Sequence, residues 1–245
     1  MDTDTSQRLI KLNRQFYQTF ANPFSITRQR LQPGVRRLLE RIPADARLLD
    51  LGCGNGELWR GLLSRGYRGQ YLGLDFSAGL LQAARERSAT EASLYRPEFL
   101  QVELTNPDWV NAISKPSIEI VTAFAVLHHL PGIETRLQVL HQVRKLLASQ
   151  GRLYLSNWQF LSSERLRARI QPWETIDMTA EQVDPGDYLL DWRQGGYGLR
   201  YVHHLDHLEL AALAQESGFR ILETFYSDGK GGQLSLYQVW EPLQQ

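Results

Sequence analysis

The chain has 245 residues, of which 42% are hydrophobic and 22% are charged, and its formal net charge is zero. This composition is ordinary for a folded protein, and the zero charge disfavours a free-standing nucleic-acid binder, which usually carries excess basic charge. The one cysteine, Cys53, excludes an intrachain disulfide and a cysteine-based metal cluster. Because the sequence shows neither an apolar leader nor an apolar run of membrane-spanning length, we expect a cytoplasmic protein without membrane contact.

Hydrophobic periodicity and turn residues predict the elements in chain order. Two helices are expected at 13–21 and 28–41, separated by a break at Asn22-Pro23, and together they could form a lid. Strands then alternate with helices, which indicates βαβ units. The strands are expected at 47–51, 71–75, 99–103, 118–124 and 152–158, and the helices between them at 57–65, 77–87, 107–113 and 134–147.

The alternation ends after residue 158, and residues 172–198 show little regular pattern. Helices are expected on either side of this segment, and two strands complete the chain. These helices are expected at 162–171 and 205–216, and the strands at 220–227 and 234–240. The glycine-rich turn at 228–232 predicts a hairpin between the two strands.

These elements predict a single α/β domain. Its core is expected to be a Rossmann-like, doubly wound, seven-stranded and mostly parallel sheet that ends in a C-terminal antiparallel hairpin. The predicted parts are a helical lid at 1–45, a cofactor-binding core at 46–158, an insert at 159–204, and a C-terminal helix and hairpin at 205–245.

A glycine-rich loop, Asp50-Leu51-Gly52-Cys53-Gly54-Asn55-Gly56, follows the first predicted strand. Glycine lets the backbone approach a ligand, and ligands of open α/β sheets bind at the carboxyl ends of the strands. A dinucleotide site would have G-x-G-x-x-G, whereas this loop has G-x-G-x-G with the acidic residues Asp50 and Glu57 around it. Acidic groups repel a pyrophosphate but suit an ammonium and a sulfonium, so the loop predicts S-adenosyl-L-methionine as the cofactor.

Further cofactor contacts are expected along the same edge. Asp75 ends the second strand and can accept hydrogen bonds from ribose hydroxyls, and Phe76 beside it can pack on adenine. Glu103 ends the third strand and Leu104 follows it, at a position where methyltransferases often place an acid near the adenine amino group. The full predicted set is Asp50, Gly52, Cys53, Gly54, Asn55, Gly56, Asp75, Phe76, Glu103, Leu104 and Ala125.

His128 and His129 follow the fourth strand, so they are expected at the same rim. Methyl transfer from a sulfonium mainly requires alignment and desolvation, and a base is needed only where the nucleophile must lose a proton. Either histidine could be a general base or a positioning donor, or could instead cap a loop or pack beside the cofactor.

Three stretches together resemble the tRNA wobble-uridine carboxymethyl methyltransferases. Residues 24–28 look like the S-x-T-R segment of that family, residues 50–56 match its D-x-G-C-G-N-G loop, and residues 125–129 resemble its A-V-x-H-H. The resemblance covers about residues 13–158. That family tends to follow its fifth strand with a W-A-x-E-Q segment, of which this chain keeps only Trp158. The resemblance implies that the enzyme esterifies a carboxymethyl group, with Arg28 and His128 or His129 as catalytic residues.

The chemistry of arginine agrees with this implication. A carboxylate nucleophile needs no base, but it needs a cation to hold it, and the planar fork of Arg28 suits two carboxylate oxygens. The alternative is that Arg28 is a surface arginine at the start of a helix.

Three functions remain open at this point. The favoured acceptor is tRNA, whose phosphates would meet the basic first 47 residues and Arg165, Arg167 and Arg169. The alternatives are a small-molecule carboxyl- or O-methyltransferase and a non-catalytic scaffold that binds the cofactor. The RNA family also implies a possible small activating subunit. No metal site is expected, because the side chains of the adjacent histidines at 203–204 diverge.

Overall fold

The computed structural model describes residues 1–91, 95–113 and 117–244. Its main sheet has seven strands in the order β3-β2-β1-β4-β5-β10-β9, and β10 runs antiparallel to both of its neighbours. The strands are β1 (Arg47–Leu51), β2 (Gln70–Asp75), β3 (Glu98–Gln101), β4 (Ile118–Phe124), β5 (Leu147–Trp158), β9 (Phe219–Ser227) and β10 (Ser235–Pro242). This topology confirms the predicted doubly wound, mostly parallel sheet with an antiparallel C-terminal hairpin.

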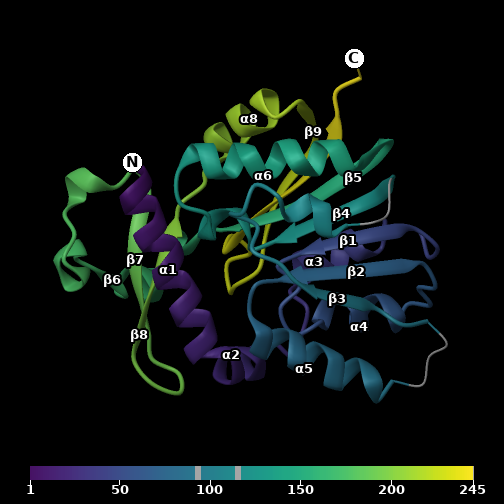
Figure 1. Cartoon of the computed structure of the whole chain (residues 1–245), viewed down its shortest axis with the longest axis horizontal. Helices are drawn as coiled ribbons and strands as arrows, with labels where there is room; N and C mark the ends of the chain where they lie inside the picture. The colour runs from purple at the N-terminus through teal and green to yellow at the C-terminus, as the bar shows by residue number, and fades with distance from the viewer. Residues whose placement is uncertain (92–94, 114–116, 245) are drawn as a thin grey trace.

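Helices cover both faces of this sheet (Figure 1). On one face, α6 (Ile133–Leu146) and α8 (His207–Glu216) contribute to an apolar core with residues of β4 and β5. On the other face, a second core contains residues of α3 (Pro33–Leu39), α4 (Glu57–Leu63) and α5 (Ala78–Ala89). The helix expected at 107–113 is only a short 3-10 turn, η1 (Trp109–Ala112). Among the described residues, no helix is both long and apolar enough to cross a membrane.

The N-terminal helices differ from the prediction. The chain forms α1 (Thr3–Thr19) and α2 (Ala21–Thr27), so the break falls at Phe20 and the break predicted at Asn22-Pro23 is wrong. Pro23 lies in the first turn of α2, where the missing N–H has no intrahelical partner to lose. The helix expected at 28–41 is also shorter, because α3 begins only at Pro33.

The segment expected to lack regular structure contains the central strand of a second sheet. This antiparallel sheet consists of β6 (Ile170–Gln171), β7 (Asp187–Trp192) and β8 (Gly198–His203), with α7 (Glu164–Arg167) before it. Figure 1 places the sheet beside α1, away from the main sheet. Five of the six residues of β7 are buried, and two of these are aspartates. The strand therefore lacks the alternation of apolar and polar residues by which a half-buried strand is recognised.

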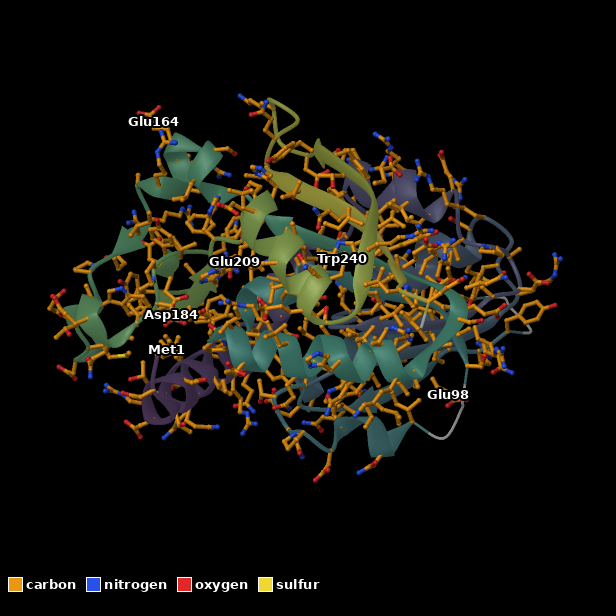
Figure 2. All side chains as sticks on the ribbon, turned by 90° about the horizontal axis from the view of Figure 1, so that it is seen from above. Met1, Glu98, Glu164, Asp184, Glu209 and Trp240 are labelled. Atoms are coloured by element: carbon orange, nitrogen blue, oxygen red, sulfur yellow. The ribbon has the colours of Figure 1, made fainter. Side chains whose placement is uncertain are left out.

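A buried ionic cluster joins this insert to the core. His203 of β8 lies 2.6 Å from an oxygen of Asp187 and 2.8 Å from an oxygen of Glu209, which is on α8. Arg136 of α6 contacts Glu209 at 3.1 Å and the hydroxyl of Tyr201 at 3.1 Å. In Figure 2, Glu209 lies where the insert meets the core. Burial lowers the pKa of His203, but its bonds to Asp187 and Glu209 outweigh burial and raise that pKa above the usual value.

We predict that His203 stabilises the fold most at acidic pH. Because its pKa is higher in the folded than in the unfolded chain, the contribution is full below about pH 6.5 and is lost as pH rises through the folded pKa. Urea unfolding of the wild type and of His203→Gln should differ by about 1.5–3 kcal/mol near pH 6, with a smaller difference at alkaline pH. A difference that does not change with pH would contradict this role.

Candidate active site

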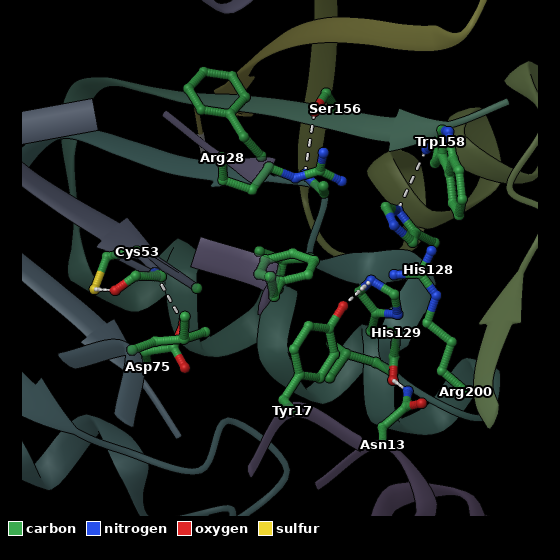
Figure 3. Close-up of a pocket in the computed structure, with 18 of the residues that line it drawn as sticks. Asn13, Tyr17, Arg28, Cys53, Asp75, His128, His129, Ser156, Trp158 and Arg200 are labelled. Atoms are coloured by element: carbon green, nitrogen blue, oxygen red, sulfur yellow. Dashed lines mark hydrogen bonds between the residues drawn. The ribbon is translucent and has the colours of Figure 1, made fainter. Parts of the chain in front are cut away.

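A cavity of about 430 Å³ opens at the carboxyl ends of the central strands, between the main sheet, α1 and the insert. It brings together most of the residues predicted for the site. Those that line it are Arg28, Gly52, Cys53, Gly54, Asn55, Asp75, Phe76, Glu103, Leu104, Ala125, His128 and His129. Figure 3 shows Cys53 and Asp75 on one side of this cavity and His128 and Arg200 on the other.

Asp50 and Gly56 do not line the cavity, so the structure does not support the predicted cofactor contacts for these two residues. Asp50 is buried below the loop, where its carboxylate accepts hydrogen bonds from the hydroxyls of Tyr71 at 2.5 Å and Thr122 at 2.6 Å. Burial raises the pKa of Asp50 to about 7. Gly56 has a φ of +75°, and an added Cβ would meet the Cβ of Ala84 at 3.1 Å. Both residues therefore shape the loop from beneath.

Asp75 connects the glycine-rich loop to the next helix. One carboxylate oxygen accepts the N–H of Gly54 at 2.9 Å, and the other accepts the N–H of Ser77, the N-cap of α5, at 2.8 Å. Burial raises the pKa of Asp75 to about 6, although these backbone bonds oppose the shift. Phe76 follows on the same rim and packs edge to face against Tyr17, with ring centroids 5.7 Å apart.

Asn55 fastens the segment that carries Arg28 to the glycine-rich loop. Its side-chain nitrogen lies 3.0 Å from the backbone oxygen of Arg28, and 3.1 and 3.0 Å from the backbone and hydroxyl oxygens of Ser25. The guanidinium of Arg28 points into the cavity (Figure 3) and stacks on Phe24 at 5.0 Å. Partial burial and the positive charge of Arg200 lower the pKa of Arg28. The position of Arg28 therefore depends on the position of the glycine-rich loop.

On η2 (Leu127–His129), His128 is buried and His129 is partly buried, and both are neutral. Nδ1 of His129 faces the carbonyl of Tyr201 at 3.3 Å, so Nδ1 carries the proton and Nε2 accepts the hydroxyl proton of Tyr17 at 2.9 Å. Nδ1 of His128 accepts the N–H of Trp158 at 3.4 Å, which leaves the proton of His128 on Nε2. Neither imidazole therefore offers a free basic nitrogen.

Charge and burial also oppose a general-base role for the histidines. Burial and the neighbouring His129 hold the pKa of His128 well below its usual value. Burial and the charge of Arg200 lower the pKa of His129 to about 3. This arrangement favours the positioning role over the general-base role among those left open by the sequence.

Sequence reasoning did not predict all of the cavity residues, and Asn13, Tyr17 and Arg200 are among those that it missed. Asn13 and Tyr17 lie on α1, where their spacing with apolar neighbours is typical of a core-facing helix. Arg200 lies on β8, one residue before the polar, aromatic cluster Tyr201-Val202-His203-His204. Arg200 is only 5% exposed, and no local sequence signal marks it, because its burial depends on elements that are distant in the chain. Of that cluster, His203 belongs to the ionic contact with the core, and among the described residues no group suited to a metal is present.

Comparisons with known proteins agree with this geometry. Residues 49–153 match the family described as a methyltransferase domain. A SAM-dependent methyltransferase from Methanosarcina mazei superposes with a TM-score of 0.66 at 20% identity, covering 88% of this chain and 99% of that chain. Magnesium protoporphyrin IX methyltransferase from Synechocystis, solved with bound SAH, gives a TM-score of 0.64 at 17% identity, covering 98% and 100%. The chain is an S-adenosylmethionine-dependent methyltransferase.

The sequence relatives of this methyltransferase differ in acceptor. A putative methyltransferase of Encephalitozoon cuniculi is 28% identical over 85% of this chain and 87% of its own length. The tRNA (carboxymethyluridine(34)-5-O)-methyltransferase of Mus musculus is 26% identical over 64% of this chain but only 22% of its own length. A trans-aconitate 2-methyltransferase from Azoarcus is 34% identical over 61% of this chain and 56% of its own length. The methyltransferase thus resembles the tRNA family at low identity.

We predict that cofactor affinity depends on the ionisation of Asp75. Since the ionised carboxylate is the better acceptor for ribose hydroxyls, the dissociation constant of S-adenosylhomocysteine should rise as pH falls below about 6, by up to tenfold per pH unit. Calorimetry between pH 5 and 8 measures this slope. Asp75→Asn, which does not ionise, should bind more weakly and with a flat profile, and an unchanged slope in this variant would contradict the assignment.

Proposed function

We propose that this methyltransferase methylates a carboxylate, and that the favoured acceptor is the carboxymethyl group of a wobble uridine in tRNA. The observation that carries the proposal is the position of Arg28. Its guanidinium points into the cofactor cavity, and its backbone is held by Asn55 of the glycine-rich loop. A cation tied to the cofactor loop is suited to bring a carboxylate oxygen in line with the methyl group.

The residues around the half of the cavity formed by the glycine-rich loop and Asp75 fit S-adenosyl-L-methionine. When bound, this cofactor supplies an electrophilic methyl group on a sulfonium. Gly52 has a φ of +65°, and an added Cβ would lie 2.7 Å from Val126, so only glycine leaves the loop open at this point. Asp75 would accept the ribose hydroxyls, and Phe76 and Leu104 would flank the adenine. Glu103 already pairs with Arg14 at 2.8 Å, so an adenine amino group would share that carboxylate.

The protonation of the histidines supports a carboxylate over a hydroxyl acceptor. A hydroxyl must lose its proton during transfer, and His128 and His129 have no free basic nitrogen to take it. A carboxylate is already ionised at neutral pH and needs only positioning and desolvation.

Basic side chains near the mouth support tRNA as the acceptor. Arg165 lines the cavity, and no carboxylate among the described residues pairs with it, so it is available for phosphate. Part of the predicted basic surface is neutralised, however, because Arg37 and Arg41 both pair with Glu223. A small activating subunit, as the resemblance implies, belongs to the same proposal.

A small carboxylate is the second candidate acceptor. The zero net charge supports it, and so does the likeness to enzymes named for trans-aconitate, which is itself a polycarboxylate. Both candidates share the chemistry that Arg28 serves, which is the formation of a methyl ester.

The test uses labelled S-adenosylmethionine with total tRNA and with a metabolite extract, in separate reactions. We expect label in the tRNA fraction, and we expect mild alkali to release it as methanol, because a methyl ester is base-labile. Label confined to small carboxylates would replace tRNA with the second candidate. Base-stable label in every product would overturn the carboxylate proposal.

We predict that Arg28→Ala lowers kcat/KM for the acceptor by about 10- to 100-fold, the range for a lost hydrogen bond to a charged group. The affinity for S-adenosylhomocysteine should stay within about twofold, as calorimetry can verify. Arg30→Ala, which removes an exposed arginine two residues away, is the matched control. A large loss of S-adenosylhomocysteine affinity in Arg28→Ala would instead assign Arg28 to the cofactor.

A further inference from the structure

Arg200 is a buried cation without a carboxylate partner. Only 5% of the residue is exposed, and its Nε has no hydrogen-bond partner. Within residues 1–91, 95–113 and 117–244, no carboxylate lies within ion-pair distance of its guanidinium. An unpaired buried charge is costly, because it loses its hydration without electrostatic compensation. The other buried arginine, Arg136, is paired with Glu209, so the absence of a partner is particular to Arg200.

Three aromatic rings hold the Arg200 guanidinium in place. Its central carbon lies 4.9 Å from the ring of Trp158, 5.4 Å from Phe16 and 5.6 Å from Trp192. These rings come from β5, α1 and β7, so three separate elements converge on one side chain. Cation–π contacts offset part of the desolvation cost, but they leave the full positive charge in place. The cage therefore fixes the direction of the guanidinium without neutralising it.

The charge of Arg200 acts on the half of the cavity away from the cofactor loop. Figure 3 shows Arg200 beside His128 and His129, on the opposite side from Cys53 and Asp75. Its charge contributes to the lowered pKa values of both histidines and of Arg28. Among the described residues that line the cavity, the acids are Asp75, Glu103 and Asp228, and the carboxylate of Asp228 already accepts the hydroxyl of Tyr237 at 2.6 Å and the N–H of Gly34 at 3.0 Å. A ligand that fills this half of the cavity meets an uncompensated positive charge.

We propose that Arg200 binds an anionic group of the methyl acceptor and, together with Arg28, selects acceptors by charge. This inference rests on the proposed function only in taking the acceptor to be a carboxylate. This proposal gives the insert a defined role. Its strand β8 carries the second contact to an anion, whereas the residues around the cofactor come from the main sheet.

The first experiment measures anion binding rather than turnover. Trans-aconitate and 5-carboxymethyluridine are titrated by calorimetry into the protein saturated with S-adenosylhomocysteine. We expect at least one probe to bind, and we expect Arg200→Met to weaken that binding at least about tenfold, with Arg200→Lys intermediate. The affinity for S-adenosylhomocysteine should be unchanged. Arg193→Met is the matched control, because Arg193 lies in the turn that follows β7, is exposed and is paired with Asp191.

The second measurement separates a binding role from a structural one. Arg200→Met removes an unpaired buried charge and keeps a long side chain in the aromatic cage, so its thermal midpoint should equal or exceed that of the wild type. A structural arginine would show the reverse, with a lower midpoint and unaltered anion affinity.

Three results would overturn the proposal. One is a wild-type protein that binds neither probe at millimolar concentration. Another is equal probe affinity in the wild type and Arg200→Met. The third is a loss of S-adenosylhomocysteine affinity in Arg200→Met, which would assign Arg200 to the carboxylate of the cofactor. Arg200-dependent probe binding without a base-labile methyl product would reject the proposed function and leave the anion contact standing.

Discussion

The acceptor half of the site depends on the side chain of Asn13. From α1 it accepts the N–H of Tyr201 at 2.8 Å and donates to the carbonyl of Tyr201 at 3.1 Å and to that of His129 at 3.2 Å. The buried side-chain amide of Asn13 thus links strand β8 of the insert to the turn after β4. The same placement of α1 brings its residues Phe16 and Tyr17 to the cavity, where Phe16 contacts Arg200 and Tyr17 forms a hydrogen bond with His129.

This alignment explains the electrostatics of the cavity. The Tyr201 carbonyl and the Tyr17 hydroxyl fix one tautomer of His129, and burial keeps both histidines uncharged. Besides Arg165 near the mouth, the lining cations without a carboxylate partner among the described residues are Arg28 on the cofactor side and Arg200 on the insert side. Positive charge without a base is the environment that holds an ionised nucleophile, and it is poorly suited to one that must first be deprotonated.

The two halves of the site are built differently. The cofactor half is a local feature, because the loop, Asp75 and Asn55 lie close to the ends of β1 and β2 and are held by backbone hydrogen bonds. The acceptor half is assembled from α1, β5, the insert and the turn after β4. An acceptor can therefore change through substitutions on the insert while the cofactor half stays the same, which accords with relatives named for both tRNA and trans-aconitate.

The sequence alone determined the sheet and the cofactor, and most of the residues that it predicted for the site line the cavity. Strand and helix periods and the glycine spacing are local signals, so Gly52, Asp75 and the two histidines were identified from the pattern. The sequence misplaced Asp50 and the Asn22-Pro23 break, and it missed β7 and Arg200. Their roles depend on burial by distant elements, because Asp50 bonds side chains of β2 and β4 from within β1, and Arg200 lies among rings from α1, β5 and β7. Whether a charged side chain is paired is decided only when those elements pack, and for this reason only the tertiary structure indicates an anion contact at Arg200.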